Sequence, residues 1–394
     1  MALVVGLVVI AAGAIYVGQS VIGHPGSTPA SSGALATILG SPPAATSGAN
    51  PSTSVSGSTA PASLPGGQTP GADQTPGAGQ TPGTGSPAPT VTTAGPHFPG
   101  GLLIADRLND RLIVVNDAGR ILWRFPVAGS LPAGETFSAD DAFIDPDGKT
   151  IVSNEEQNQV IVRIDIATRK VVWEYGQFGK SGHGPGQLFN PDDAYPLANG
   201  DITVADIKNC RVLEIAPDKQ IVRQWGQTDV CVDHPPQTYG QPNGDTPLPD
   251  GGMLVTEIYG SRLVRLSSDG KVLWDIHVPL HYPSDAQLLA NGNILVVDYW
   301  TPGTLLVLDP KSGQVVYRYA PASGPGKLNH PSLALPLPDG TFVLNDDRRH
   351  RVVIIDPTTS TITWTYGHTG KAGSADGYLN TPDGMDVAAP GIFT

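Results

Sequence analysis

The amino-terminal part of the sequence lacks charge. No Asp, Glu, Lys or Arg occurs from Met1 to Ala72; the first acid is Asp73 and the first base is Arg107. The formal net charge of -13 is therefore carried entirely by the chain that follows. Because phosphate binding needs clustered Lys and Arg, this distribution argues against a nucleic-acid partner.

Motifs of common enzyme classes are also missing. The sequence has no G-x-S-x-G nucleophile elbow, no Walker loop, no dinucleotide fingerprint between a strand and a helix, and no H-E-x-x-H. We therefore assign no catalytic residue. The absence of these motifs favours a protein that is not an enzyme, without deciding the question.

An apolar run opens the chain. Residues 2–17 contain no polar group except the Tyr16 hydroxyl, and the stretch reaches Ile22. Because about 20 residues cross the ~30 Å of hydrocarbon in a bilayer, we expect residues 1–22 to be a transmembrane helix or signal anchor. The alternative is a cleaved signal peptide, although no basic residue precedes the run. The first interpretation places the protein in the cell membrane with the rest of the chain on the extracytoplasmic side; the second makes it secreted.

Residues 23–97 consist mainly of Gly, Pro, Ser, Thr and Ala, and "QTPG" recurs at positions 68, 74 and 80. Such a segment has too few large apolar side chains to offset the entropy of ordering its backbone. We expect a disordered linker with a mean reach of roughly 50 Å.

From residue 98 onward one pattern occurs six times. An apolar run ends on an acid or amide: "GLLIAD", "TIVSN", "DITVAD", "GMLVTE", "NILVVD" and "TFVLND". Two further short runs follow each time, rich in β-branched and aromatic residues and separated by turns, which is typical of strands. A repeat of 40 to 50 residues with four strands predicts a propeller blade. We expect residues 98–394 to form an all-β, six-bladed propeller, closed by a C-terminal strand near residues 383–390 that joins blade one.

The most regular repeat is "YGQFGKSGHGPGQLFNPDDAYPLANGDITVADIKNCRV", with "GPGQL", a Pro, "VAD" and an Arg five residues after its Asp. This pattern resembles the NHL-repeat propellers. The resemblance covers about residues 98–394 and implies the fold but no activity, because such propellers include scaffolds, ligand binders and enzymes. The family includes a lyase with a histidine-bound zinc. More distantly the chain resembles calcium-dependent lactonases and arylsulfotransferases.

Acids at the end of one strand recur with an Arg at the start of the next. The pairs are Asp106 with Arg111, Asp206 with Arg211, Glu257 with Arg262, and Asp346 with Arg351. We expect structural ion pairs across one hairpin. Where Asn154 replaces the acid, Gln159 replaces the Arg, as expected of residues that brace one another.

A column of carboxylates precedes these hairpins. Aligning the innermost strands brings Asp141, Asp193 and Asp285 to one position, and Asp140, Asp192, Asn243, Ser284, Ser332 and Asp383 to the position before it. Carboxylates around a narrow channel repel one another unless a cation or hydrogen-bond donors intervene. The column therefore suggests a calcium site, and the histidines His183 and His234 of the crossings suggest zinc. The alternatives are Asp residues that cap turns and solvated histidines.

Aromatic residues and one unpaired acid occupy turns of blades four and five. Tyr259, Tyr299 and Trp300 lie in hairpins, and Asp298 has no Arg five residues later. These four residues are the candidate ligand-binding set, with packing between blades as the alternative use of the rings.

The two cysteines, Cys210 and Cys231, are expected on the same face of blade three. An even count in an exported chain favours a disulfide between them.

Together these features suggest an extracytoplasmic, membrane-tethered binding or scaffolding module for a protein, peptide or glycan. The alternative is a metal-dependent hydrolase or lyase whose site lies at the channel mouth.

Overall fold

The structure is a computed structural model, and it describes residues 96–393. These residues form 24 strands and three short 3-10 helices. Among them, no helix is long and apolar enough to span a bilayer. The expected transmembrane segment, residues 1–22, and nearly all of the expected linker, residues 23–97, lie outside the described residues.

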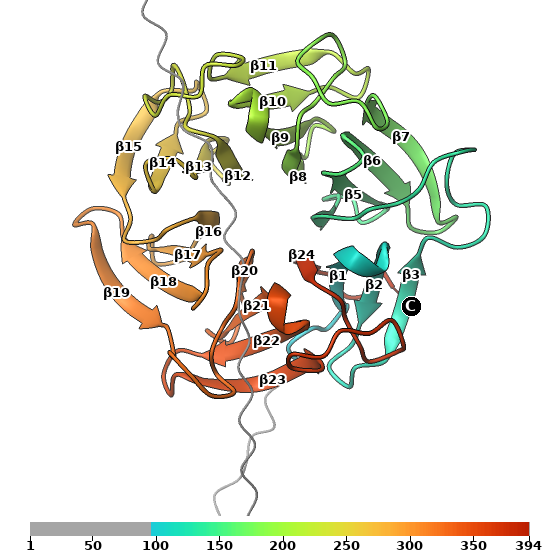
Figure 1. Cartoon of the computed structure of the whole chain (residues 1–394), viewed down its shortest axis with the longest axis vertical. Helices are drawn as coiled ribbons and strands as arrows, with labels where there is room; N and C mark the ends of the chain where they lie inside the picture. The colour runs from blue at the N-terminus through green and yellow to red at the C-terminus, as the bar shows by residue number, and fades with distance from the viewer. Residues whose placement is uncertain (1–95, 394) are drawn as a thin grey trace, which may run out of the picture. The chain divides into compact units, whose positions relative to one another are not determined.

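The strands form six antiparallel sheets of four strands each (Figure 1). Blade one contains β24 (Pro382–Val387), β1 (Leu102–Asp106), β2 (Arg111–Val115) and β3 (Ile121–Phe125). Blade two contains β4 (Ala142–Ile144), β5 (Thr150–Glu155), β6 (Val160–Asp165) and β7 (Lys170–Gly176). Blade three contains β8 (Pro191–Pro196), β9 (Ile202–Asp206), β10 (Arg211–Ile215) and β11 (Ile221–Trp225).

Blade four contains β12 (Pro242–Pro247), β13 (Met253–Glu257), β14 (Arg262–Leu266) and β15 (Val272–His277). Blade five contains β16 (Pro283–Leu288), β17 (Ile294–Asp298), β18 (Thr304–Asp309) and β19 (Gln314–Tyr319). Blade six contains β20 (Ala334–Pro336), β21 (Phe342–Asp346), β22 (Arg351–Asp356) and β23 (Thr361–Gly367). The 3-10 helices are η1 (Arg107–Asn109), η2 (Ile207–Asn209) and η3 (Asp347–Arg349).

The C-terminal strand closes the ring. β24 pairs antiparallel with β1, with Leu102 opposite Val387 and Ile104 opposite Met385. The predicted six blades and their offset closure are therefore confirmed. Because both ends of the propeller meet in one sheet, the innermost strands leave no unpaired edge at the seam.

The second strands of the blades are buried on both sides. The residues of β1, β9, β13, β17 and β21 are all buried, which explains why they read as continuous apolar runs rather than alternating ones. Tryptophans of the outer strands reach the neighbouring blade: the Trp123 indole donates to the Ile166 carbonyl at 2.9 Å, and Trp173 donates to Pro217 at 2.9 Å. These rings therefore pack between neighbouring blades.

The hairpins between second and third strands lie on the same face as the crossings, the segments that lead from one blade to the next. One acid ends the second strand of every blade; we call these the hairpin acids. They are Asp106, Glu155, Asp206, Glu257, Asp298 and Asp346, and all are buried. Each accepts a backbone N–H from the crossing that enters its own blade, from Asn380, Ser138, Phe189, Gly240, His281 and Asn329 respectively. The hairpin acids thus hold the crossings above the channel.

The four predicted ion pairs are present, in unequal strength. Nε of Arg111, Arg211 and Arg351 lies 2.7, 2.8 and 2.8 Å from the carboxylate of its hairpin acid. Arg262 lies 3.7 Å from Glu257, because its guanidinium also pairs with Asp233 at 2.8 Å and with Asp275 at 2.9 Å.

The expected Asn154–Gln159 substitute for an ion pair is wrong by one residue. The strand register places Glu155 opposite Val160, and Asn154 opposite Ile161. Glu155 is therefore the hairpin acid of blade two. Asn154 instead donates its side-chain N–H to the Pro191 carbonyl of the next blade, at 3.1 Å.

Candidate functional site

Irregularities in the innermost strands turn successive polar residues toward the channel. The pairing of β8 with β9 shifts between Asp192 and Tyr195, and Asp193 has φ +45°. Similar shifts interrupt β12 and β16 after Pro242 and Pro283. A bulge suspends the alternation of side chains between the two faces of a strand, so two neighbouring acids can face the same space.

The first position of this repeat lines one cavity at the channel mouth. We call the six residues the first ring: Asp140, Asp192, Asn243, Ser284, Ser332 and Asp383. The cavity has a volume of about 170 Å³, and its remaining walls are Arg107, Glu156, Ile207, Tyr282 and Tyr299. The second ring follows one residue later in each blade: Asp141, Asp193, Gly244, Asp285, Leu333 and Gly384.

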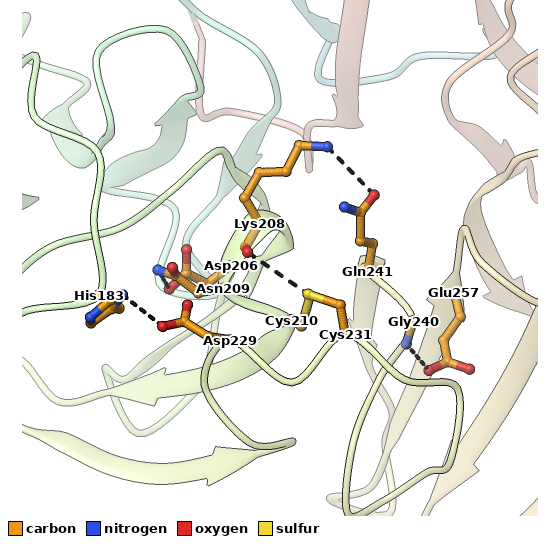
Figure 2. The surroundings of a disulfide bond; sticks show 10 residues. All are labelled: His183, Asp206, Lys208, Asn209, Cys210, Asp229, Cys231, Gly240, Gln241 and Glu257. Carbon is orange, nitrogen blue, oxygen red and sulfur yellow. Dashed lines mark hydrogen bonds and ion pairs between the residues drawn. A yellow bond between two sulfur atoms is a disulfide. The ribbon is translucent and has the colours of Figure 1, made fainter. Parts of the chain in front are cut away.

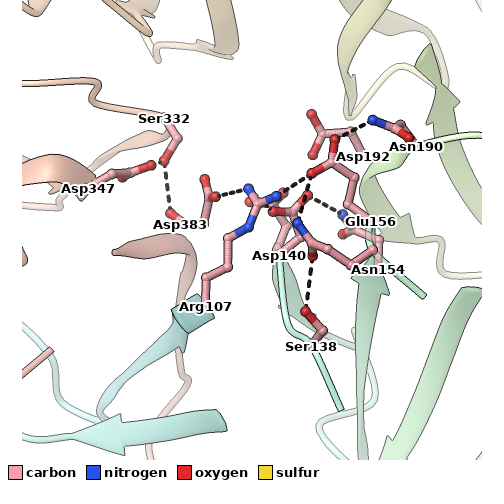
Figure 3. A network of polar contacts seen from close by, with 12 residues as sticks. Arg107, Ser138, Asp140, Asn154, Glu156, Asn190, Asp192, Ser332, Asp347 and Asp383 are labelled. Carbon is pink, nitrogen blue, oxygen red and sulfur yellow. Dashed lines mark hydrogen bonds and ion pairs between the residues drawn. The ribbon is translucent and has the colours of Figure 1, made fainter. Parts of the chain in front are cut away.

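Arg107 joins the acids across the seam of the propeller (Figure 3). Its guanidinium contacts Asp383 at 2.6 Å on one side, and Asp140 and Glu156 on the other. Burial lowers the pKa of Arg107, but the charges of Asp140, Asp383 and Glu156 outweigh burial and raise it above its usual value. The guanidinium therefore stays charged, and its single charge is shared among three carboxylates.

Buried carboxylates crowd around this mouth. Burial, reinforced by the charge of Asp383, raises the pKa of Asp141 to about 7. Burial also raises the pKa of Asp285 to about 6, although Tyr195 and Thr246 each donate a hydrogen bond to it at 2.9 Å. The pKa of Asp193 is raised well above its usual value by burial and by the charges of Asp285 and Asp141. Too little positive charge is present nearby for all these groups to ionise unaided.

Several oxygen atoms at the mouth have no hydrogen-bond partner among residues 96–393. They include Oδ1 of Asn243, which lines the mouth cavity, and Oδ2 of Asp193 in the second ring. Both residues are at most 3% exposed. A buried polar atom without a partner costs free energy, so the mouth is a place where a ligand, ion or proton would improve stability.

Three of the carboxylates are close enough to share one ion. Single oxygen atoms of Asp140, Asp141 and Asp192 all lie within 4.8 Å of one another, the one such group in the described part of the chain. The predicted metal residues Asp193 and Asp285 lie in the same ring as Asp141 but outside this group. His183 and His234 are not part of it either; His183 pairs with exposed Asp229 at 2.8 Å beside the disulfide (Figure 2).

The four candidate ligand-binding residues divide into three situations. Tyr299 lines the mouth cavity. Tyr259 and Trp300 are exposed on the crossing face, and Trp300 stacks on His281 at a centroid distance of 4.9 Å. Asp298 is buried, and it accepts hydrogen bonds from the backbone N–H groups of His281 and Tyr282.

A groove adjoins the mouth cavity. It has a volume of about 520 Å³ and shares Arg107 and Tyr299 with the cavity, and its other walls include Arg348, His350 and Gln157. A separate groove of about 510 Å³ lies between blades three and four. Its walls include Trp225, Leu248 and the turns that precede β9 and β13, at the opposite end of these strands from the hairpin acids. None of the acids of the two rings, which we call the channel acids, borders it.

The family of the chain can be stated at this point. The PQQ_2 family, described as outer membrane protein assembly factor BamB, matches residues 67–218 and 213–382. The chain belongs to the PQQ_2 family. No curated protein matches it. The NHL-repeat resemblance stays a prediction.

Solved structures similar to this PQQ_2 chain share its fold at low identity. A protein of unknown function from Bacteroides caccae is 15% identical, with a TM-score of 0.53, over 73% of this chain and 98% of the other. A chain of a nidogen/laminin complex is 14% identical, with a TM-score of 0.53, over 74% and 98%. Virginiamycin B lyase from Staphylococcus aureus is 15% identical, with a TM-score of only 0.41, over 60% and 71%.

Sequence patterns singled out Tyr299 but not the column to which it belongs in the PQQ_2 propeller. The residues after five of the hairpin acids face the channel: Arg107, Glu156, Ile207 and Tyr299 line the mouth cavity, and Asp347 accepts a hydrogen bond from Ser332 of the first ring at 3.0 Å. Once the hairpin acids are aligned in the correct register, this column can be read directly from the sequence.

Proposed function

We propose that this protein is a membrane-tethered, extracytoplasmic propeller of the NHL-like kind that binds a peptide or protein segment on its crossing face. A cationic group of the ligand, a lysine side chain or an amino terminus, enters the acidic mouth. The description of the family as an assembly factor supports a binding or scaffolding role.

One observation carries this proposal: the mouth cavity presents four carboxylates and one guanidinium. Asp140, Asp192, Asp383 and Glu156 line it, and Arg107 is the only base among its walls. The volume of about 170 Å³ is below the roughly 300–1,000 Å³ of pockets that enclose drug-sized ligands. The mouth therefore suits one side-chain head group rather than a whole small molecule.

The adjoining groove can hold the residues next to that group. Its volume of about 520 Å³ is three times that of the mouth, and Tyr299 forms a wall of both. Arg348 is exposed in this groove and has no acidic partner among residues 96–393. An acidic pit beside a free arginine favours a ligand that carries both charges, as a peptide does.

The test is calorimetric titration of the full chain with short peptides that contain one lysine, matched by the same peptides with acetylated lysine. Acetylation removes the charge and should abolish binding. Tyr299→Ala and Asp192→Asn should each weaken binding at least tenfold, whereas exposed Asp376→Asn should not. Equal binding of charged and acetylated peptides would contradict the proposal.

The tether is tested separately. Full-length protein should sediment with membranes, and the same chain without residues 1–22 should be released. A soluble full-length protein that retains its first residues would contradict the anchor.

A further inference from the structure

The first and second rings also contain a site for a metal ion. We propose that Asp140, Asp141 and Asp192 bind a divalent calcium ion, with Asn243 as a neutral oxygen ligand. Asp140, Asp192 and Asn243 also line the mouth cavity, so calcium and the cationic group of a peptide should compete for it.

The spacing of the carboxylates fits one ion. Calcium binds oxygen at about 2.3–2.6 Å, so two ligands on opposite sides of one ion are at most about 5 Å apart. The three carboxylates offer oxygens that all lie within 4.8 Å of one another. The three carboxylates therefore lie close enough together for one ion to contact all of them.

The carboxylates have free capacity for an ion. One oxygen of Asp140 contacts Arg107, and the other accepts, among residues 96–393, only a long hydrogen bond of 3.4 Å from Asn154. Asp192 accepts from Asn243 at 2.5 Å and from the backbone N–H of Asp193 at 3.2 Å. A carboxylate offers about four lone-pair sites, so these groups can still bind an ion.

A second feature, independent of the acids, points to the same centre. Asn243 is 3% exposed, lines the mouth cavity and donates to Asp192 at 2.5 Å, yet its Oδ1 has no partner among residues 96–393. A buried amide oxygen with nothing to accept is costly. Calcium commonly takes such amide oxygens together with carboxylates.

The donor set selects a hard cation. The group contains only oxygen ligands, without imidazole or thiolate, which favours calcium or magnesium over zinc. Calcium tolerates the irregular arrangement of three carboxylates and an amide better than magnesium, which needs a near-octahedral shell.

Glycine 384 keeps room for one of the ligands. A Cβ at Gly384 would lie 2.5 Å from Oδ1 of Asp141 and 2.4 Å from its Cα. Any side chain at this place in the second ring would push Asp141 away from the centre.

The experiment is a calcium titration of the chelator-treated full chain, by calorimetry and by melting temperature, with magnesium and zinc as comparisons. We expect one equivalent of calcium and a raised melting temperature. Asp141→Asn should weaken calcium binding at least thirtyfold, and Asn243→Leu at least fivefold. Asp386→Asn, at the other end of β24, should leave calcium binding unchanged.

Three results would overturn the site: no calcium binding at millimolar concentration, calcium binding that survives both Asp141→Asn and Asn243→Leu, or tighter binding of zinc than calcium. Near-ultraviolet circular dichroism shows whether each variant is folded. If Asp141→Asn fails to fold, Asn243→Leu decides, since it removes no charge.

Failure of this site and failure of the peptide proposal are distinguishable. Tyr299→Ala should weaken peptide binding while calcium binding stays unchanged. Asp141→Asn, tested with peptide in the presence of a chelator, should do the reverse, because Asp141 is an ion ligand that does not line the mouth cavity.

Discussion

Two sets of buried carboxylates occur in this propeller, and their surroundings differ. The hairpin acids receive donors: Asp206 accepts from Arg211, Asn209 and the Phe189 backbone, at 2.7–2.8 Å. The channel acids are paired less evenly: Asp285 accepts from Tyr195 and Thr246, but Oδ2 of Asp193 has no partner among residues 96–393, although Asp193 is as deeply buried as a hairpin acid. A buried carboxylate with a full set of donors can remain charged and hold the fold together. A buried carboxylate without donors is costly unless it takes up a proton or binds a cation.

The largest effect should come from the same substitution made once in each set. Asp206→Asn removes the charge that compensates buried Arg211, and we expect the free energy of unfolding to fall by about 3 kcal/mol. Asp193→Asn, on the neighbouring strand, removes a charge that has no donor. Asparagine also tolerates the left-handed backbone at this position. We expect Asp193→Asn to leave stability unchanged or to raise it by up to about 2 kcal/mol.

Urea unfolding of the full chain at pH 8 with a chelator present measures both values. Exposed Asp376→Asn is the control and should change the free energy of unfolding by less than about 0.5 kcal/mol. Equal losses for Asp206→Asn and Asp193→Asn would remove the distinction between the two sets.

The next effect concerns the crossing between blades three and four. The predicted disulfide between Cys210 and Cys231 is confirmed, with a Cα–Cα distance of 5.2 Å (Figure 2). It ties this crossing to the hairpin of blade three. Replacing both cysteines with serine should cost about 3 kcal/mol by the loop-entropy estimate, seen as an earlier urea midpoint. A variant as stable as the parent would show that the hydrogen bonds hold this crossing without the disulfide.

The hairpin acid that holds the same crossing is the exception within its set. Glu257 accepts from Gly240 at 2.9 Å, but Arg262 is 3.7 Å away and Oε2 has no hydrogen-bond partner in the described residues. Burial, together with Asp233, raises the pKa of Glu257 to about 8. In this respect Glu257 resembles the channel acids.

This exception predicts a pH effect. Between pH 4.5 and about 8 the folded protein keeps the Glu257 proton, whereas the unfolded chain loses it. The contribution of Glu257 to the free energy of unfolding is therefore most favourable at or below pH 4.5 and decreases as the pH rises to about 8. Glu257→Gln keeps an acceptor for Gly240 without the charge. At pH 8 to 9 the variant should be more stable than the parent, by an amount of the order of 2 kcal/mol, and the two should converge near pH 4.5. Parallel stability curves across this range would contradict the raised pKa.

Sequence reasoning predicted the ring but only part of the site. Periodic apolar runs fix the blade count and the closing strand, because burial of both sheet faces leaves a clear pattern. The register of one hairpin was wrong by a residue, since "SNEEQNQ" offers two neighbouring places for the acid. Glu156 was missed as a result, because Asn154 rather than Glu155 was taken as the acid position. Arg107 was missed although Asp106 was placed correctly, because no sequence pattern marks the residue after a hairpin acid as facing the channel. The carboxylates of Asp140 and Asp192 come from neighbouring blades and lie close together. The irregular pairing of β8 with β9 that turns Asp192 toward the channel is not marked in the sequence.

The smallest effect tests whether histidines belong to the acidic centre. His183 pairs with Asp229 where both side chains are about half exposed, so His183→Ala should change the free energy of unfolding by less than about 0.5 kcal/mol. It should also leave the metal content of purified protein unchanged, and the same is expected of His234→Ala. Metal analysis of the two variants beside Asp141→Asn checks this. Loss of zinc from a histidine variant would show that the ion is bound by histidines of the crossings and not by the channel acids. A metal site would then not be predicted by buried carboxylates that lack donors.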